Sequence, residues 1–321
     1  MAGGADVNRR DFLGLMGVGL AGVGGMRLPR WAPRADGDVL VERWSWAMGQ
    51  PVHLRLFAGS EQAGYEAAQA ALAELRRVER ALSRFDEASD LSELNRRAGR
   101  GALAVGPDLA SALAACARFE RTTGGAFNPA VEPLMRAWGF HASRTTEPTA
   151  AELAAARAAV RAAKIEVHGR RVALRGASTR LDLGGIGVGY GLDRAGEVLR
   201  RAGIRRALLD VSGDCLALGA PPGEAGWLVE VADPDRDGAV LPGARTRLRD
   251  AALATSSNLV SVVRYGRAVR GHVMDPDSGY PAARCRQVTV VARSGLEADA
   301  LSTAMLVEPR RFPGVLRAWT V

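Results

Sequence analysis

The sequence predicts an α+β fold with mixed sheets and flanking helices, and three observations support this prediction. Strand-like alternation and helix-like periodicity are both present, but they do not follow one another in the regular order that a doubly wound parallel sheet requires. The chain has 321 residues, of which 47% are hydrophobic and 24% charged. This composition is typical of globular proteins and excludes disordered and collagen-like chains. At about 150 residues per domain, the length fits one large domain or two intertwined ones.

The first residues are expected to be an export signal rather than part of the fold. Arg9 and Arg10 precede an apolar run from Phe12 to Met26, which is shorter than the ~20 residues of a membrane span. An arginine pair followed by Phe-Leu is typical of a twin-arginine signal, whose pathway exports folded proteins. We therefore expect a signal peptide at 1–35 and a mature domain at 36–321, located in the periplasm or on the outer face of the cytoplasmic membrane. No stretch of the mature chain predicts a membrane span.

The first half of the mature chain predicts one strand and three helices. Alternating apolar residues at 52–56 predict the strand, and apolar residues at helical spacing predict a helix at 68–82. Asp108 is expected to cap a second helix. Thr149 and Glu152 have the spacing of a capping box, which predicts a third, alanine-rich helix.

The second half predicts shorter elements in a less regular order. A hairpin is expected at 165–174, with Gly169-Arg170-Arg171 as its turn. The other expected strands are 179–183, 207–211, 227–231, 259–264 and 288–292, and the other expected helices are 190–201 and 298–307. There is no internal repeat and no low-complexity linker to mark a domain boundary.

Charge and cysteine content exclude several classes of function. Lys and Arg number 43 and Asp and Glu 35, but the basic residues are scattered among acidic ones, and aromatic residues make up only 5%. A nucleic-acid-binding protein would present a basic stripe and stacking platforms, so no nucleic-acid partner is expected. Cys116, Cys215 and Cys285 are widely spaced, which predicts buried free thiols rather than a zinc site or a disulfide framework.

A glycine-rich segment at 184–189 first suggests a dinucleotide-binding enzyme. It follows the predicted strand 179–183 and precedes a helix and a strand that ends at Asp210. The spacing differs from the dinucleotide fingerprint, because Tyr190 stands where the third glycine is required and Asp182 stands where an apolar residue is expected. A nicotinamide-dependent Rossmann oxidoreductase therefore stays as a less favoured alternative. More generally, glycines before a helix N-terminus can bind a phosphate.

Short motifs follow one another along the chain in a definite order. They are Leu82-Ser-Arg-Phe-Asp86, Thr123-Gly-Gly-Ala-Phe-Asn-Pro129, Leu181-Asp-Leu-Gly-Gly-Ile-Gly-Val-Gly-Tyr190, Ser212-Gly-Asp214, Ala254-Thr-Ser256, Gly271-His-Val-Met-Asp-Pro276 and Ala298-Asp-Ala-Leu-Ser-Thr-Ala304. The ordered series resembles the ApbE family of FAD:protein FMN transferases from about Met48 to Val307. The resemblance implies an ApbE-like FAD-binding domain that transfers FMN from FAD, with a divalent metal, to a threonine hydroxyl of an exported redox protein, releasing AMP.

Oxygen-bearing residues near the C-terminus suit a magnesium ion. Asp299 and Thr303 are four apart, so one helix face presents a carboxylate and a hydroxyl together, and Mg²⁺ prefers oxygen ligands. The resemblance adds the backbone carbonyl of Gly185, and Ser302 is a further candidate ligand. The alternative role for Asp299 is an acidic residue that interacts with the helix dipole.

His272 is the candidate general base, because the ordinary histidine pKa of about 6.5 suits removal of a proton from the acceptor threonine. Its alternative role is packing or a solvated surface position. Asp275 and Pro276 are expected to shape the turn that follows, with Asp275 accepting backbone N–H groups. The resemblance also implies the flavin contacts, which are Met48, Phe85, Ala126, Phe127, Asn128, Asp182, position 188, His272 and Val273.

The chain departs from the family pattern at three positions. Val188 replaces the usual lysine, Asn128 the usual aspartate, and Ser257 a common glycine. Losing a cation beside a pyrophosphate predicts weaker phosphate binding or slower transfer, unless a neighbour such as Arg194 supplies the charge. An FAD binder that does not transfer FMN, or that hydrolyses FAD, is therefore the alternative within the family. A binding module without any cofactor is a third possibility.

Overall fold

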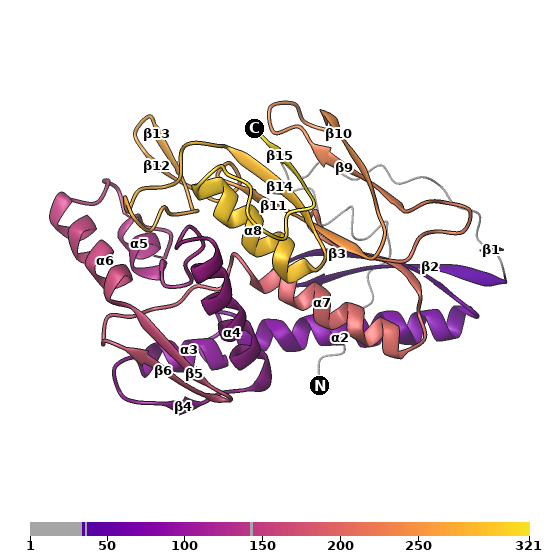
Figure 1. Ribbon diagram of the computed structural model, residues 1–321, viewed down its shortest axis with the longest axis horizontal. Coiled ribbons are helices and arrows are strands. Elements are labelled where there is room, and N and C mark those ends of the chain that lie inside the picture. Colours follow the sequence, from indigo (N-terminus) through magenta and orange to yellow (C-terminus); the bar gives the residue numbers. More distant parts are fainter. Residues whose placement is uncertain (1–33, 36, 142–143) are drawn as a thin grey trace. The chain divides into compact units, whose positions relative to one another are not determined.

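The computed structural model describes residues 34–35, 37–141 and 144–321, which form seven helices and fifteen strands (Figure 1). The predicted combination of helices and sheets is confirmed, and the fold is mixed α/β. The expected signal peptide lies outside the described residues except for Arg34 and Ala35. Among the helices that the structure describes, none is both long and apolar enough to cross a bilayer.

Contacts divide the chain into two compact units, and each unit is built from three separate segments. Unit 1 comprises the residues up to Arg77 together with Val188–Ala254 and Val291–Ala298. Unit 2 comprises Val78–Gly187, Thr255–Val290 and Asp299–Val321. Every passage of the chain from one unit to the other falls inside a helix or strand. These elements are α2 (Glu61–Leu82), α7 (Gly187–Arg201), β11 (Ala251–Ser257), β14 (Gln287–Ala292) and α8 (Gly295–Val307).

Unit 1 is an antiparallel sheet with helices on one face. The strand order is β1 (Arg34–Ala35), β2 (Asp38–Ala47), β3 (Gln50–Ala58), β7 (Arg206–Val211), β8 (Asp214–Leu218) and the first part of β11. Val52, Leu54 and Leu56 are buried, as their alternation predicts. β9 (Trp227–Ala232) and β10 (Val240–Leu248) pair separately as a hairpin.

Glycines allow the two helices of unit 1 to lie close to the sheet and to each other. A Cβ at Gly64 of α2 would lie 2.5 Å from Val41, and one at Gly196 of α7 would lie 2.5 Å from Leu216. The two helices run beside each other in Figure 1, and a Cβ at Gly191 of α7 would lie 3.2 Å from Leu75 of α2. α7 is therefore fixed on two sides.

Unit 2 holds the remaining helices around a small sheet. The helices are α3 (Asp90–Arg96), α4 (Pro107–Thr122), α5 (Glu132–Ala137) and α6 (Ala150–Ala162). The small sheet has the order β4 (Leu103–Ala104), β6 (Arg171–Arg175), β5 (Lys164–His168), and a separate hairpin pairs β12 (Val262–Tyr265) with β13 (Ala268–Gly271). The rest of β11, β14 and β15 (Arg317–Thr320) follow one another in a sheet. Every residue of β14 is buried.

Several predicted elements are confirmed at close to their expected bounds. The predicted hairpin is β5–β6, and the predicted helices 190–201 and 298–307 are α7 and α8. The capping box begins α6 as expected, because Glu152 N donates to Thr149 Oγ1 at 3.2 Å and Thr149 N donates to Glu152 Oε2 at 2.7 Å. The predicted strands 207–211, 227–231 and 288–292 correspond to β7, β9 and β14.

The expected strand at 179–183 is wrong, because this segment pairs with a side chain rather than with a strand. Asn95 Nδ2 donates to the carbonyl of Leu181 at 2.9 Å, and Leu181 N donates to Asn95 Oδ1 at 2.8 Å. The side-chain amide of Asn95 thus makes the two backbone hydrogen bonds that a neighbouring strand would make. The dinucleotide-binding unit requires a strand before the glycines, so its central element is missing here.

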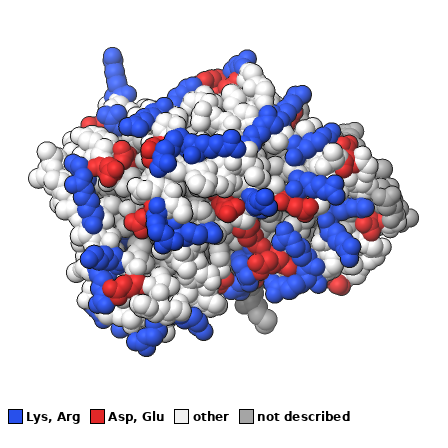
Figure 2. Space-filling model, in the orientation of Figure 1, with Lys and Arg blue, Asp and Glu red and all other residues white. Residues whose placement is uncertain are grey.

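Three further expectations need correction. Asp108 does not cap α4, because the helix begins one residue earlier at Pro107, with Gly106 as its N-cap. The expected strand 259–264 begins only at Val262, after a turn. Cys116 and Cys215 are fully buried free thiols as predicted, but Cys285 is only half-buried. On the face drawn in Figure 2, basic and acidic side chains are interspersed.

Candidate functional site

Hydroxyl groups from β11 and α8 gather beside Gly185 in unit 2. Ser256 Oγ lies 2.8 Å from Ser302 Oγ and 3.1 Å from Thr303 Oγ1. Ser302 Oγ also donates to the backbone carbonyl of Asp299 at 2.9 Å. A Cβ at Gly185 would lie only 2.9 Å from Thr303 Oγ1, so this close approach of backbone to hydroxyl requires glycine. The structure therefore brings Gly185, Ser302 and Thr303 together, with Asp299 one turn earlier on the same helix.

This set of oxygen atoms suits a hard cation. Asp299 is 5% exposed and is the single carboxylate in the set, and the other donors are hydroxyls and a backbone carbonyl. Within the described residues, no group of three or more His, Cys, Asp or Glu side chains is arranged to hold a metal. Magnesium commonly uses one or two carboxylates and takes its other ligands from substrate phosphates and water. The residues present thus fit Mg²⁺ rather than zinc.

The charge of Asp299 acts on the nearby Cys116 thiol, but Cys116 does not suit the role of a metal ligand. Burial raises the pKa of the Cys116 thiol, and the carboxylates of Glu120 and Asp299 raise it further. A metal ligand must be the thiolate. Cys116 therefore stays a neutral thiol within the core.

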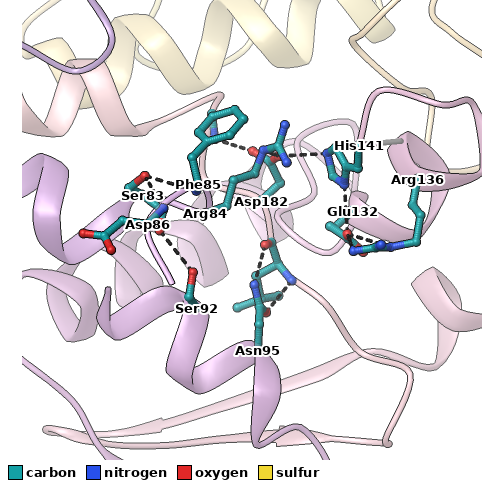
Figure 3. A network of polar contacts seen from close by, with 12 residues as sticks. Ser83, Arg84, Phe85, Asp86, Ser92, Asn95, Glu132, Arg136, His141 and Asp182 are labelled. Carbon is teal, nitrogen blue, oxygen red and sulfur yellow. Dashed lines mark hydrogen bonds and ion pairs between the residues drawn. The ribbon is translucent and has the colours of Figure 1, made fainter. Parts of the chain in front are cut away.

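Asp182 is the centre of a second group of polar side chains (Figure 3). Arg84 Nε lies 2.8 Å from Asp182 Oδ2, and Gly184 N donates to Oδ1 at 2.7 Å. The guanidinium of Arg84 also stacks 4.0 Å from the ring centroid of Phe85. The Phe85 side chain is 81% exposed, which leaves an aromatic face open to a ligand.

His141 connects Asp182 to a buried carboxylate. His141 Nε2 lies 3.9 Å from Asp182 Oδ2, and His141 Nδ1 lies 2.9 Å from Glu132 Oε1 (Figure 3). Burial alone would raise the pKa of Glu132, but hydrogen bonds from His141 and Arg136 outweigh burial and hold it below its ordinary value. Glu132 is therefore ionised, and because a carboxylate only accepts, His141 donates to it from Nδ1.

No sequence pattern assigns a role to Arg84, Glu132 or His141. Arg84 lies inside the Leu82–Asp86 motif, which is the one sequence signal for this group. Asp182 is distant in sequence from both Arg84 and His141, and periodicity does not identify such pairs.

His272 follows β13 and is half-buried beside Phe140, with the ring centroids 6.4 Å apart. Its Nδ1 has no hydrogen-bond partner among the described residues. Burial lowers the pKa of His272, and the nearby carboxylate of Asp182 and a backbone hydrogen bond with Ser261 oppose this only in part. The imidazole is therefore neutral at pH 7, which is the form that accepts a proton.

Asn258 and Asp275 fix the segment around His272. Asn258 Oδ1 accepts the N–H of Val273 at 2.8 Å, and its Nδ2 donates to Ala282 O at 2.7 Å. Asp275 accepts the N–H groups of Asp277 and Ser278, which confirms its expected role in the turn. Both sides of the segment are thus held by side chains of unit 2.

The predicted flavin residues of the 126–129 loop lie next to Asp182. Asp182 N donates to Pro129 O at 2.9 Å, while Ala126 and Phe127 are buried. Asn128 Oδ1 accepts the N–H of Ala130 at 2.8 Å. An aspartate can accept the same bond, so the departure at 128 preserves the turn.

Met48 and Val188 belong to unit 1. Met48 has a left-handed φ of 59° in the β2–β3 turn, and its Sδ lies 3.6 Å from a Cβ position on Gly191. Val188 is half-buried in the first turn of α7. Arg194 forms ion pairs with Glu197 and, at 3.5 Å, with Glu74. These two carboxylates compete for its charge, so Arg194 is a poor substitute for the missing lysine.

Comparisons with known proteins agree on one family. The model of the ApbE family matches residues 48–317. The FAD:protein FMN transferase of Treponema pallidum (strain Nichols) is 30% identical, over 75% of this chain and 73% of its own length. The enzyme of the same name from Rhodobacter capsulatus is 32% identical over 68% of this chain, which spans 42% of that longer relative.

Two solved structures share the fold. The crystal structure of an ApbE protein from Thermotoga maritima matches with a TM-score of 0.75 and 29% identity, over 84% of this chain and 86% of that chain. The apo form of the flavinyl transferase ApbE of Pseudomonas stutzeri matches with a TM-score of 0.73 and 26% identity, over 84% and 85% of the two chains.

Proposed function

Because the chain belongs to the ApbE family, we propose that it is an FAD:protein FMN transferase that modifies a threonine of a partner protein. The observation that carries the proposal is the gathering of Gly185, Ser302 and Thr303, with Asp299 one turn away, in a chain whose relatives bear that name. The resemblance stated from the sequence motifs is confirmed by the family match. The nicotinamide-dependent alternative loses support, because the strand that it requires is missing at 179–183.

The proposed reaction is a transfer of a phosphoryl-linked group. The threonine hydroxyl oxygen attacks the FMN phosphorus of FAD, a new P–O bond forms, and the bond between that phosphorus and the bridging oxygen breaks. AMP leaves with the bridging oxygen. His272 takes the threonine proton, because its imidazole is neutral and burial keeps its pKa low.

Asp299, Thr303, Ser302 and the carbonyl of Gly185 are the residues that would hold Mg²⁺. The ion supplies charge neutralisation at the pyrophosphate, where negative charge develops during transfer. The protein's own part is to fix these oxygens. The Ser256 hydroxyl orients those of Ser302 and Thr303, and the lack of space for a Cβ at Gly185 keeps its backbone close.

The group around Asp182 is the proposed flavin-binding side of the site. Phe85 offers an exposed aromatic face to a planar ring, and Arg84 holds both Phe85 and Asp182 in place. Asp182 accepts hydrogen bonds from an amine or hydroxyl of FAD. Of the other contacts that the resemblance implies, Ala126, Phe127, Asn128 and Val273 lie in unit 2 with Asp182, and Met48 and Val188 lie in unit 1.

Two measurements test the proposal. The purified chain is incubated with FAD, desalted and scanned for the visible flavin band, and we expect retained flavin. It is then incubated with FAD, Mg²⁺ and a threonine-bearing acceptor, and we expect the acceptor to gain the mass of FMN. No retained flavin together with binding of NAD(P) would overturn the proposal, and flavin binding without any mass gain would favour a non-transferring relative.

The metal assignment predicts that Asp299→Ala abolishes Mg²⁺ binding and metal-dependent turnover of FAD. The substitution removes the one carboxylate of the set and leaves the other oxygens in place. Calorimetric titration of Mg²⁺ in the presence of FAD measures the loss. Glu297→Ala, on the first turn of the same helix, is the matched control. Unchanged Mg²⁺ affinity in Asp299→Ala would contradict the assignment.

A further inference from the structure

Asp193 of α7 binds the beginning of α8. Asp193 Oδ1 accepts the N–H of Gly295 at 2.7 Å, and Oδ2 accepts that of Leu296 at 2.9 Å. These N–H groups belong to the first turn of α8, where a helix leaves its backbone donors without intrahelical partners. Both carboxylate oxygens are thus used to attach one helix to the other. The reaction proposed above gives Asp193 no role.

A glycine contact strengthens this attachment. A Cβ at Gly295 would lie 2.5 Å from the carbonyl oxygen of Gly189, so the two backbones touch. Gly189 lies four residues before Asp193 and therefore on the same face of α7. The carboxylate and the backbone contact act on neighbouring turns of α7. Together they restrict both rotation and sliding of α8.

The two attached helices continue into the proposed metal residues. Gly185 lies two residues before α7, and Asp299 and Thr303 lie on the next two turns of α8. One residue of rotation in an α-helix is about 100°. A small change of register at Gly295 would therefore move Thr303 away from Gly185 and rotate Asp299 with it.

Burial of the Asp193 carboxylate costs free energy, and its hydrogen bonds to α8 offset part of that cost. Burial raises the pKa of Asp193, while the N–H groups of Leu296 and Gly295 oppose that rise. A serine already accepts at the same helix end, because Ser294 Oγ accepts the N–H of Glu297 at 3.2 Å. The two side chains accept from different N–H groups, and Asp193, unlike Ser294, also joins α8 to α7.

We propose that Asp193 is a positioning residue for the metal site, which holds the first turn of α8 against α7 and so sets Asp299 and Thr303 relative to the Gly185 carbonyl. This inference rests on the proposed function, since Mg²⁺ binding is part of it. It adds a residue that touches neither metal nor substrate.

Two caps on the same helix end provide a matched test. Asp193→Ala removes the attachment to α7, whereas Ser294→Ala removes only the local cap. Mg²⁺ affinity is measured by calorimetry with FAD present, and thermal stability is measured for the same samples. We expect Asp193→Ala to weaken Mg²⁺ binding about 10-fold or more, as partners that orient metal ligands commonly do. We expect Ser294→Ala to lower the melting temperature while changing the affinity less than about 2-fold.

Asp193→Asn keeps the proposal testable if the alanine variant does not fold. Its amide oxygen still accepts one N–H, so we expect an affinity between wild type and Asp193→Ala. Wild-type affinity in a folded Asp193→Ala or Asp193→Asn would overturn the inference. Equal losses of affinity in the Asp193 and Ser294 variants would also overturn it, because Asp193 would then be only a cap. If the wild type binds no Mg²⁺, the proposed metal-dependent function itself fails, and the inference fails with it.

Discussion

Val188 is the departure from the family pattern that bears most directly on the proposed transfer of FMN. Val188 lies in the first turn of α7 and lacks the cation of the family pattern, and Arg194 is already paired with Glu74 and Glu197. We predict that Val188→Lys raises the rate of FMN transfer about 10-fold or more, because charge on the pyrophosphate is better neutralised in the transition state. Mass spectrometry of the acceptor over time measures the rate.

Val188→Leu serves as the control for this substitution, since it changes the volume without adding charge. We expect it to leave the rate close to that of the wild type. If the wild type transfers FMN rapidly and lysine brings no gain, position 188 does not limit the reaction in this chain.

His272 predicts the pH dependence of transfer. Its base form is needed, and burial lowers its pKa from the ordinary 6.5, so the base form persists to lower pH than in an exposed histidine. We therefore expect the acidic limb of kcat/KM to have its midpoint below pH 6.5. A pH series with a saturating Mg²⁺ concentration measures it. A midpoint above 6.5, or an acidic limb that is unchanged in His272→Gln, would contradict the assignment.

The capping box of α6 gives a prediction at the scale of one element. Thr149→Ala removes the side-chain oxygen that accepts from Glu152 N and with it one of the two bonds of the box. We expect the melting temperature to fall by about 2–4 °C, with FAD binding unchanged. Thr145→Ala, at an exposed position before the helix, is the control and should leave the melting temperature unchanged. Equal melting temperatures for all three proteins would show that the box does not stabilise the helix.

Elements with local signals could be predicted from the sequence. The alternation in β3, the capping box of α6 and the turn of the β5–β6 hairpin each depend on residues a few positions apart. The segment 179–183 also alternates, but its partner is Asn95, 86 residues earlier. Local pattern cannot distinguish pairing with a strand from pairing with a distant amide.

In the candidate site, too, features with local signals could be predicted and contacts between distant segments could not. The spacing of Asp299 and Thr303 is local to one helix, and the resemblance supplied Gly185, which the structure places against Thr303. The partners of Asp182 could not be predicted, because Arg84 and His141 approach it from segments about 98 and 41 residues away in sequence. Which charges meet in the interior depends on the tertiary fold.

For the whole molecule, we predict export by the twin-arginine pathway. Replacing Arg9 and Arg10 by lysine should prevent export, because this signal requires the arginine pair. Fractionation of cells that express the full chain, with detection by antibody, measures the location. Replacing Arg27 and Arg30, which lie after the apolar run, is the control and should not prevent export. Export that persists without Arg9 and Arg10 would contradict the prediction.

The interleaving of the two units has a consequence for how the protein is made. A ribosome synthesises a chain from its N-terminus, and independent domains can fold one after another as they emerge. Here the last pieces of the two units are Val291–Ala298 and Asp299–Val321, so neither unit is complete until synthesis is nearly finished. If such a chain crossed a narrow translocon during synthesis, its early segments would be on the other side of the membrane before the late segments that complete each unit had been made. A route that waits for a finished, folded molecule avoids this conflict.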